Sequence, residues 1–154
     1  MTTLHFVRRA RKARPEHGIR KGMSFFWWQF AYGEKQYSLT KPRRSQYATR
    51  SDFLREMYDV EDEVNALAGD PADVIDALGE FADRVAALGD DANDRLENNR
   101  AAFPGSNKIE LLENRVDACR DLANELREAA NQLSDDSTAD DMQSALGTIG
   151  WDYE

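Results

Sequence analysis

The sequence has one cysteine, Cys119, and two histidines, His5 and His17, among 154 residues. A single cysteine cannot form an internal disulfide, so we expect a reducing compartment. Cys119 also falls at an apolar helical position, where cysteine acts as a small core residue. Without a nucleophile that a nearby base can activate, the sequence predicts no enzyme and no cofactor.

Long apolar runs are also missing. The most apolar stretch, residues 25–32, is far shorter than the roughly 20 residues that span a bilayer. The basic segment 7–14 has no apolar run behind it, unlike a secretory signal peptide. No cysteine near the first strands could hold zinc, and the carboxylate pairs lack the spacing of a calcium loop. We therefore expect a soluble protein of the cytoplasm, with no metal and no membrane partner.

Charge is distributed very unevenly along the chain. Residues 1–50 contain 12 Lys and Arg against two acids, a net charge of +10. Residues 51–154 contain eight against 27 acids, a net charge of -19. Such asymmetry is expected of a chain that touches a polyanion with one half, or of halves that pack on each other. We predict a basic, aromatic, β-rich head over 1–50, an acidic helical bundle over 51–134, and an acidic tail with a short helix over 135–154.

The head predicts a β-hairpin. Aromatic residues are concentrated in residues 24–40 on both sides of a turn that contains Gly33. We expect Gly33 to adopt the positive φ of that turn. Before the hairpin, residues 1–23 are punctuated by proline and glycine, which predicts a basic arm or short turn. After it, residues 41–46 predict an extended basic loop, since Pro42 cannot donate to a strand ladder.

The rest of the chain predicts helices. Apolar residues recur at helical spacing over residues 51–67, 72–102 and 107–133, and a shorter helix is expected over 140–146. Asp70 is expected to cap the second helix, with Pro71 at its first position.

The third helix carries a regular apolar seam. Its members are Ile109, Leu112, Val116, Cys119, Ala123, Leu126, Ala130 and Leu133. A seam of more than three heptads packs against another helix, which is either the second helix of the same chain or a copy in a homodimer. The predicted fold class is α+β, a small antiparallel β-hairpin or sheet followed by an antiparallel helical bundle with a long coiled-coil-like hairpin.

The basic aromatic head is the strongest functional signal. Its candidate phosphate-binding residues are Arg8, Arg9, Arg11, Lys12, Arg14, Lys35, Lys41, Arg43 and Arg44. Such cations neutralise phosphates while exposed rings stack on bases, which predicts an accessory protein that binds nucleic acid. The bland alternative is that the rings form a small core and the cations a solvated surface.

Two other functions stay open. Acidic helices can imitate the phosphate rows of DNA, which would make the protein an inhibitor of a nucleic-acid enzyme. The coiled-coil seam is also compatible with a virion or assembly protein.

A resemblance adds to this reading. The residues that carry it are Gly22, Phe26-Trp27-Trp28, Phe30, Gly33, Lys35, Tyr37-Ser38, Thr40, Pro42-Arg43 and Ser45-Gln46. With these residues, and the acidic helices that follow, the chain resembles a family of small phage and prophage proteins. The resemblance implies a phage-encoded role in host takeover, anti-defence or DNA transactions in the cytoplasm of the host cell. An anti-defence or host-takeover inhibitor would bind a host protein. The resemblance assigns no binding residue. The order of strand, Gly-Lys turn, strand and helix also resembles the arm-binding modules of phage integrases, from which the long loop 41–49 departs.

Overall fold

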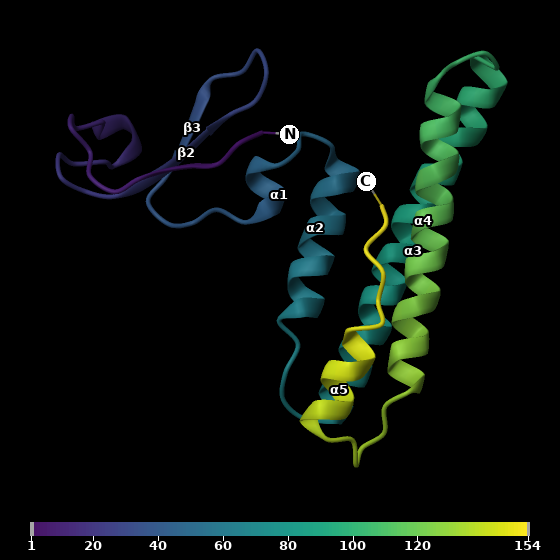
Figure 1. Ribbon diagram of the computed structural model, residues 1–154. Coiled ribbons are helices and arrows are strands. Elements are labelled where there is room, and N and C mark those ends of the chain that lie inside the picture. Colours follow the sequence, from purple (N-terminus) through teal and green to yellow (C-terminus); the bar gives the residue numbers. More distant parts are fainter. Residues whose placement is uncertain (1, 154) are drawn as a thin grey trace. The chain divides into compact units, whose positions relative to one another are not determined.

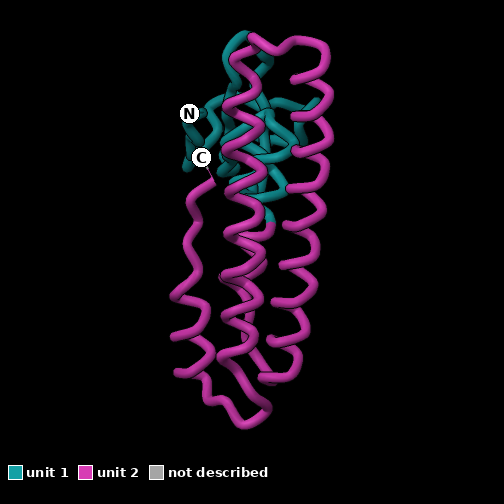
Figure 2. The backbone as a smooth tube through the Cα atoms, turned by 90° about the vertical axis from the view of Figure 1, so that its right-hand side faces the viewer, with its two compact units in different colours: residues 1–59 teal, residues 60–154 magenta. Residues whose placement is uncertain are grey.

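A computed structural model describes residues 2–153 and divides the chain into two compact units, Met1–Asp59 (unit 1) and Val60–Glu154 (unit 2; Figure 2). The terminal residues of the predicted head and tail, 1 and 154, lie outside the described residues. The fold class is α+β as predicted, with a three-stranded antiparallel sheet followed by helices (Figure 1). The predicted domain boundaries at residues 50 and 134 follow charge and composition, and they stay predictions.

The sheet of unit 1 consists of β1 (His5–Val7), β2 (Phe25–Gln29) and β3 (Lys35–Ser38), with β2 in the middle. The β2–β3 hairpin confirms the prediction for residues 24–40, where aromatic side chains favour a pleated, half-buried surface. The interpretation of residues 1–23 as an arm or short turn is wrong at β1. This three-residue strand exists because it pairs with β2, a partner some 20 residues away along the chain.

The connection between β1 and β2 is folded rather than extended. It contains a short 3-10 helix, η1 (Pro15–His17), which ends at Gly18 with a φ of 68°. The amide of Ala10 donates to the carbonyl of Met23 across the base of this loop at 2.7 Å. The loop closes a small apolar cluster of Ala10, Ile19 and Phe25, against which Val7, Trp27 and Tyr37 are partly buried.

The turn between β2 and β3 differs from the prediction in one respect. The positive φ falls on Tyr32, at 60°, and not on Gly33. The Gly33 amide closes the turn by donating to the carbonyl of Phe30 at 3.0 Å. Gly33 serves another purpose, because a Cβ there would overlap the guanidinium of Arg50.

Two helices follow the sheet, α1 (Arg44–Tyr47) and α2 (Asp52–Asn65). The extended loop predicted for residues 41–46 is therefore wrong from Arg44 onward. Ser45, inside this single turn of helix, is buried, and Pro42 just before it is buried as well. Pro42 alone favours an extended chain. The burial of Pro42 and Ser45 and the hydrogen bond from Ser45 to Asp59 favour the helical turn instead.

Unit 2 is built on an antiparallel hairpin of α3 (Pro71–Ala102) and α4 (Lys108–Asn131), which lie side by side along their length (Figure 1). The start of α3 confirms the predicted cap, because the Asp70 side chain accepts a hydrogen bond from the Ala72 amide at 3.0 Å and Pro71 is the first helical residue.

The predicted seam of α4 lies largely inside this unit. Leu112, Cys119, Ala123, Leu126 and Leu133 are buried, whereas Ile109, Val116 and Ala130 are partly exposed. Leu122 and Ala129 are buried as well, so the apolar face is broader than the predicted stripe. The predicted homodimer stays a prediction.

Helices α3 and α4 approach closely at Gly89, where an added Cβ would lie 3.0 Å from Cβ of Cys119. Two ion pairs bracket this crossing. Arg127 contacts Asp83 at 3.0 Å, and Arg100 contacts Glu113 at 2.5 Å.

The last helix, α5 (Ala139–Leu146), begins in a capping box of Thr138 and Asp141. The backbone and side-chain hydrogen bonds from Thr138 lower the pKa of the Asp141 carboxyl. The tail after α5 is docked within unit 2, since the Gly150 amide donates to Glu125 at 2.6 Å and the Tyr153 hydroxyl donates to Glu61. No helix within residues 2–153 combines the length and the apolar character needed to cross a membrane.

Candidate functional site

One face of the sheet carries an aromatic row whose rings hold cations. Opposed residues in antiparallel strands share a face, so the register places His5, Trp27 and Tyr37 in one line across the three strands. The His5 ring stacks on Trp27 with centroids 4.1 Å apart and an interplanar angle of 12°. Lys35 Nζ lies 4.6 Å from the centroid of the same indole. The Trp27 ring, on the middle strand, thus joins an imidazole from β1 to an ammonium from β3.

The neighbouring ring, Tyr37, is also contacted by one histidine ring and one cation. The His17 ring stacks on it at 4.3 Å, and the Arg14 guanidinium lies 4.8 Å from its centroid. Both companions come from the loop between β1 and β2, which covers this end of the sheet face. The other end of the row, formed by the exposed His5 with the partly exposed Trp27 beside it, is open to solvent.

A hollow of about 610 Å³ adjoins the open end. It is lined by Thr2, Thr3, His5, Trp27, Gln29, Phe30, Ala31, Ala48, Thr49 and Arg50. The Arg50 guanidinium lies 5.0 Å from the Phe30 centroid, which fixes a positive charge at its wall. With hydroxyls, an amide, aromatic surface and a cation, the lining suits a ligand that has both anionic and planar parts.

The predicted cations fall into three groups. Arg8, Arg9, Arg11 and Lys12 are exposed on the loop that follows β1, and Lys41 is exposed after β3. Lys35 and Arg14 rest on rings of the aromatic row described above, Lys35 on Trp27 and Arg14 on Tyr37. Arg43 and Arg44 form the third group, at the start of α1.

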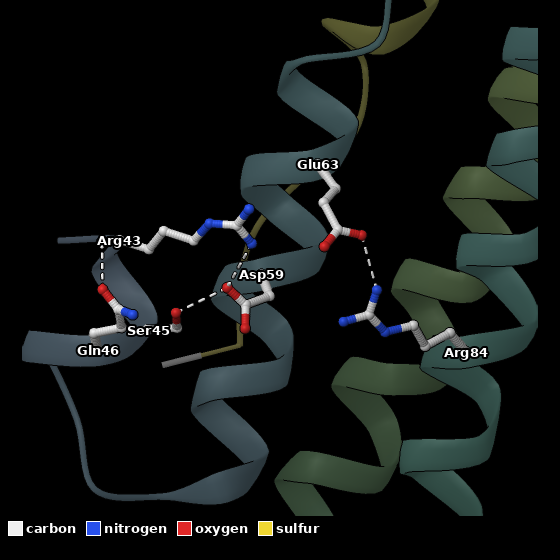
Figure 3. A network of polar contacts seen from close by, with 6 residues as sticks. All are labelled: Arg43, Ser45, Gln46, Asp59, Glu63 and Arg84. Atoms are coloured by element: carbon white, nitrogen blue, oxygen red, sulfur yellow. Dashed lines mark hydrogen bonds and ion pairs between the residues drawn. The ribbon is translucent and has the colours of Figure 1, made fainter. Parts of the chain in front are cut away.

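Arg43 and Arg44 are engaged by side chains of α2. Figure 3 shows Asp59 accepting a hydrogen bond from Ser45 Oγ at 2.8 Å, with Arg43 Nη1 at 3.8 Å from the same carboxylate oxygen. The Arg44 guanidinium lies 4.1 Å from the Tyr58 centroid. These contacts give both arginines a role in holding α1, although Arg43 keeps 64% of its side-chain surface exposed.

The sequence reasoning missed His5 and Arg50. Arg50 was detectable, since it is the last cation of the basic region and lies as near to Arg44 along the chain as Lys35 does to Lys41. His5 was not, because its place beside Trp27 depends on the register of β1, which the sequence does not reveal.

Unit 2 contributes a different surface. It contains 24 acids against seven Lys and Arg, a net charge of -17, whereas unit 1 contains 13 Lys and Arg against five acids, a net charge of +8. Some acids of unit 2 are paired, as Glu63 is with Arg84 at 2.9 Å (Figure 3). Seven cations cannot neutralise 24 carboxylates, so the unit presents a strong negative potential.

Cys119 is fully buried between α3 and α4, and burial raises the pKa of its thiol to about 11. Within the described part of the chain, no group of three or more His, Cys, Asp and Glu side chains is arranged to hold a metal ion. Compared with known protein families, curated proteins and solved structures, the chain shows no match.

Proposed function

We propose that the protein binds nucleic acid through unit 1, using the open end of the aromatic row and the hollow beside it, and that it is a phage-encoded accessory protein without catalytic activity. The observation that carries this proposal is the pairing of cations with two rings that line the hollow, at Lys35 over Trp27 and Arg50 over Phe30. The resemblance to small phage and prophage proteins supports the phage origin.

Geometry and charge both favour this function. A cation that rests on a ring is held in place before a ligand arrives, so less side-chain entropy is lost when it meets a phosphate. The exposed Arg8, Arg9, Arg11 and Lys12 add sequence-independent attraction to a polyanion. The net charge of +8 on unit 1 supplies the same attraction at longer range.

Charge reversal tests the proposal. Fluorescence anisotropy of labelled single-stranded DNA, duplex DNA and RNA measures binding by the full chain and by a Lys35→Glu, Arg50→Glu double variant. We expect the double variant to lose at least about 10-fold in affinity, because two phosphate contacts become repulsive. Lys108→Glu makes the same kind of change at an exposed site of unit 2 and should leave binding nearly unchanged. Equal losses in the two proteins would contradict a site on unit 1.

Arg43→Glu and Arg44→Glu are expected to behave differently from the Lys35 and Arg50 changes. Because Arg43 contacts Asp59 and Arg44 covers Tyr58, reversal there removes contacts that hold α1. Their effect on binding should therefore come with a lower thermal midpoint, which circular dichroism measures.

The net charge of -17 on unit 2 favours a second candidate, an inhibitor that occupies the nucleic-acid site of a basic host protein. It predicts a stable complex with such a protein that DNA competes away, and no binding of nucleic acid by the chain itself. Size-exclusion chromatography with and without competitor DNA separates this candidate from the first.

A further inference from the structure

The turn between β2 and β3 presents one aromatic side chain fully to solvent. Tyr32 has a relative exposure of 109%, the highest among the exposed large apolar side chains of the described residues. Its φ of 60° lies in the left-handed region, which residues other than glycine seldom adopt. The chain thus holds a bulky ring at a position where glycine would be less strained.

The next residue, Gly33, does not take over the positive φ. Its missing Cβ instead leaves space for the side chain of Arg50. The Arg50 guanidinium lies where a Cβ of residue 33 would be and rests on Phe30, at the base of the same turn. On the other side of the turn, Lys35 rests on Trp27. Along the chain, the exposed Tyr32 therefore lies between Phe30, which holds Arg50, and Lys35, which rests on Trp27.

We propose that Tyr32 is a base-stacking residue and that the interface takes single-stranded nucleic acid. This inference rests on the proposed function. A base can lie flat on a projecting ring only if its own face is free, and in a duplex the neighbouring base pairs cover both faces. Lys35 and Arg50 then meet the phosphates on either side of the stacked base. Because every base has a π face, this mode tolerates any sequence and serves DNA and RNA alike.

The test compares oligonucleotides that differ only in their bases. Labelled single-stranded DNA, the matching RNA, the DNA duplex and an abasic strand with the same number of phosphates are each titrated with the full chain. We expect the wild-type chain to prefer the base-bearing strands over both the duplex and the abasic strand. Tyr32→Gly should weaken binding to the base-bearing strands by between about 5-fold and about 150-fold and leave the abasic strand unchanged.

The Tyr32→Gly change also separates binding from folding. Glycine relieves the left-handed strain, so its thermal midpoint should equal or exceed that of the wild-type chain. Tyr32→Asn, which also tolerates a left-handed backbone, should repeat the loss of binding, and Tyr32→Trp should retain it. Phe103→Gly removes another exposed ring, 67% exposed in the turn between α3 and α4, and should not change affinity.

Each outcome decides between the proposals. If the wild-type chain binds no nucleic acid, the proposed function and this inference both fall. If the wild-type chain binds and Tyr32→Gly binds the base-bearing strand equally well, only the stacking role falls. A loss that is equal on base-bearing and abasic strands, or a wild-type preference for the duplex, also overturns the stacking role. Quenching of a 2-aminopurine base that disappears in Tyr32→Gly supports it directly.

Discussion

Cation–aromatic pairs recur among the residues of unit 1. Lys35 with Trp27 and Arg50 with Phe30 lie at the proposed interface, whereas Arg14 with Tyr37 and Arg44 with Tyr58 support the loop after β1 and α1. Each exposed pair contributes about 0.5–1 kcal/mol. The sequence shows that cations and aromatic residues are both abundant in unit 1. Which cation meets which ring depends on the strand register and on the turns that bring distant residues together. A residue-level account of the site therefore requires the fold.

Cys119 gives a prediction for a single residue. Since its thiol pKa is raised from 9.0 to about 11 by burial, the native chain has about 100-fold less thiolate at pH 8 than the unfolded chain. Labelling by a thiol-reactive disulfide should therefore be at least that much slower in buffer than in denaturant. The thiol favours the folded state fully below pH 9, and this contribution is lost as the pH rises through about 11. Equal labelling rates in both conditions would contradict the burial.

Among the elements, those specified by local chemistry were predicted and those specified by distant partners were not. The start of α3 follows from Asp70 and Pro71, which act within one turn. Strand β1 was missed because three residues carry no reliable periodicity and gain their strand only by pairing with β2. Glycine is the usual residue at a positive φ, so the sequence predicts that conformation at Gly33. The structure instead needs glycine there to leave space for Arg50, a residue distant in the sequence that the local turn signal does not include.

Helix α3 contains a matched pair of glycines that tests its packing. Gly79 has open space around an added Cβ, whereas a Cβ at Gly89 would lie 3.0 Å from Cβ of Cys119. Gly79→Ala should raise the free energy of unfolding by up to about 1 kcal/mol, the usual gain from helix propensity. Gly89→Ala should gain less or lose stability, because the α3–α4 crossing must widen. Chemical denaturation measures both, and an equal gain would show that the helices are not in close contact at Gly89.

For the whole molecule, the distribution of charge is the property that sequence alone settles. Unit 1 carries +8 and unit 2 carries -17, so a polyanion is attracted by one part of the chain and repelled by the other. Salt screens both effects, but contacts with phosphates also release counterions from the nucleic acid. Binding through unit 1 should therefore weaken steeply as salt rises, despite the net charge of -9 on the chain.

The most direct test of the account is the salt dependence of binding between the wild-type chain and labelled single-stranded DNA. With four or more phosphate contacts, a plot of the logarithm of the binding constant against that of the salt concentration should have a slope of about -3 or steeper. The Lys35→Glu, Arg50→Glu variant should have a shallower slope. Absence of binding at low salt, or binding that does not change with salt, would contradict a nucleic-acid interface on unit 1.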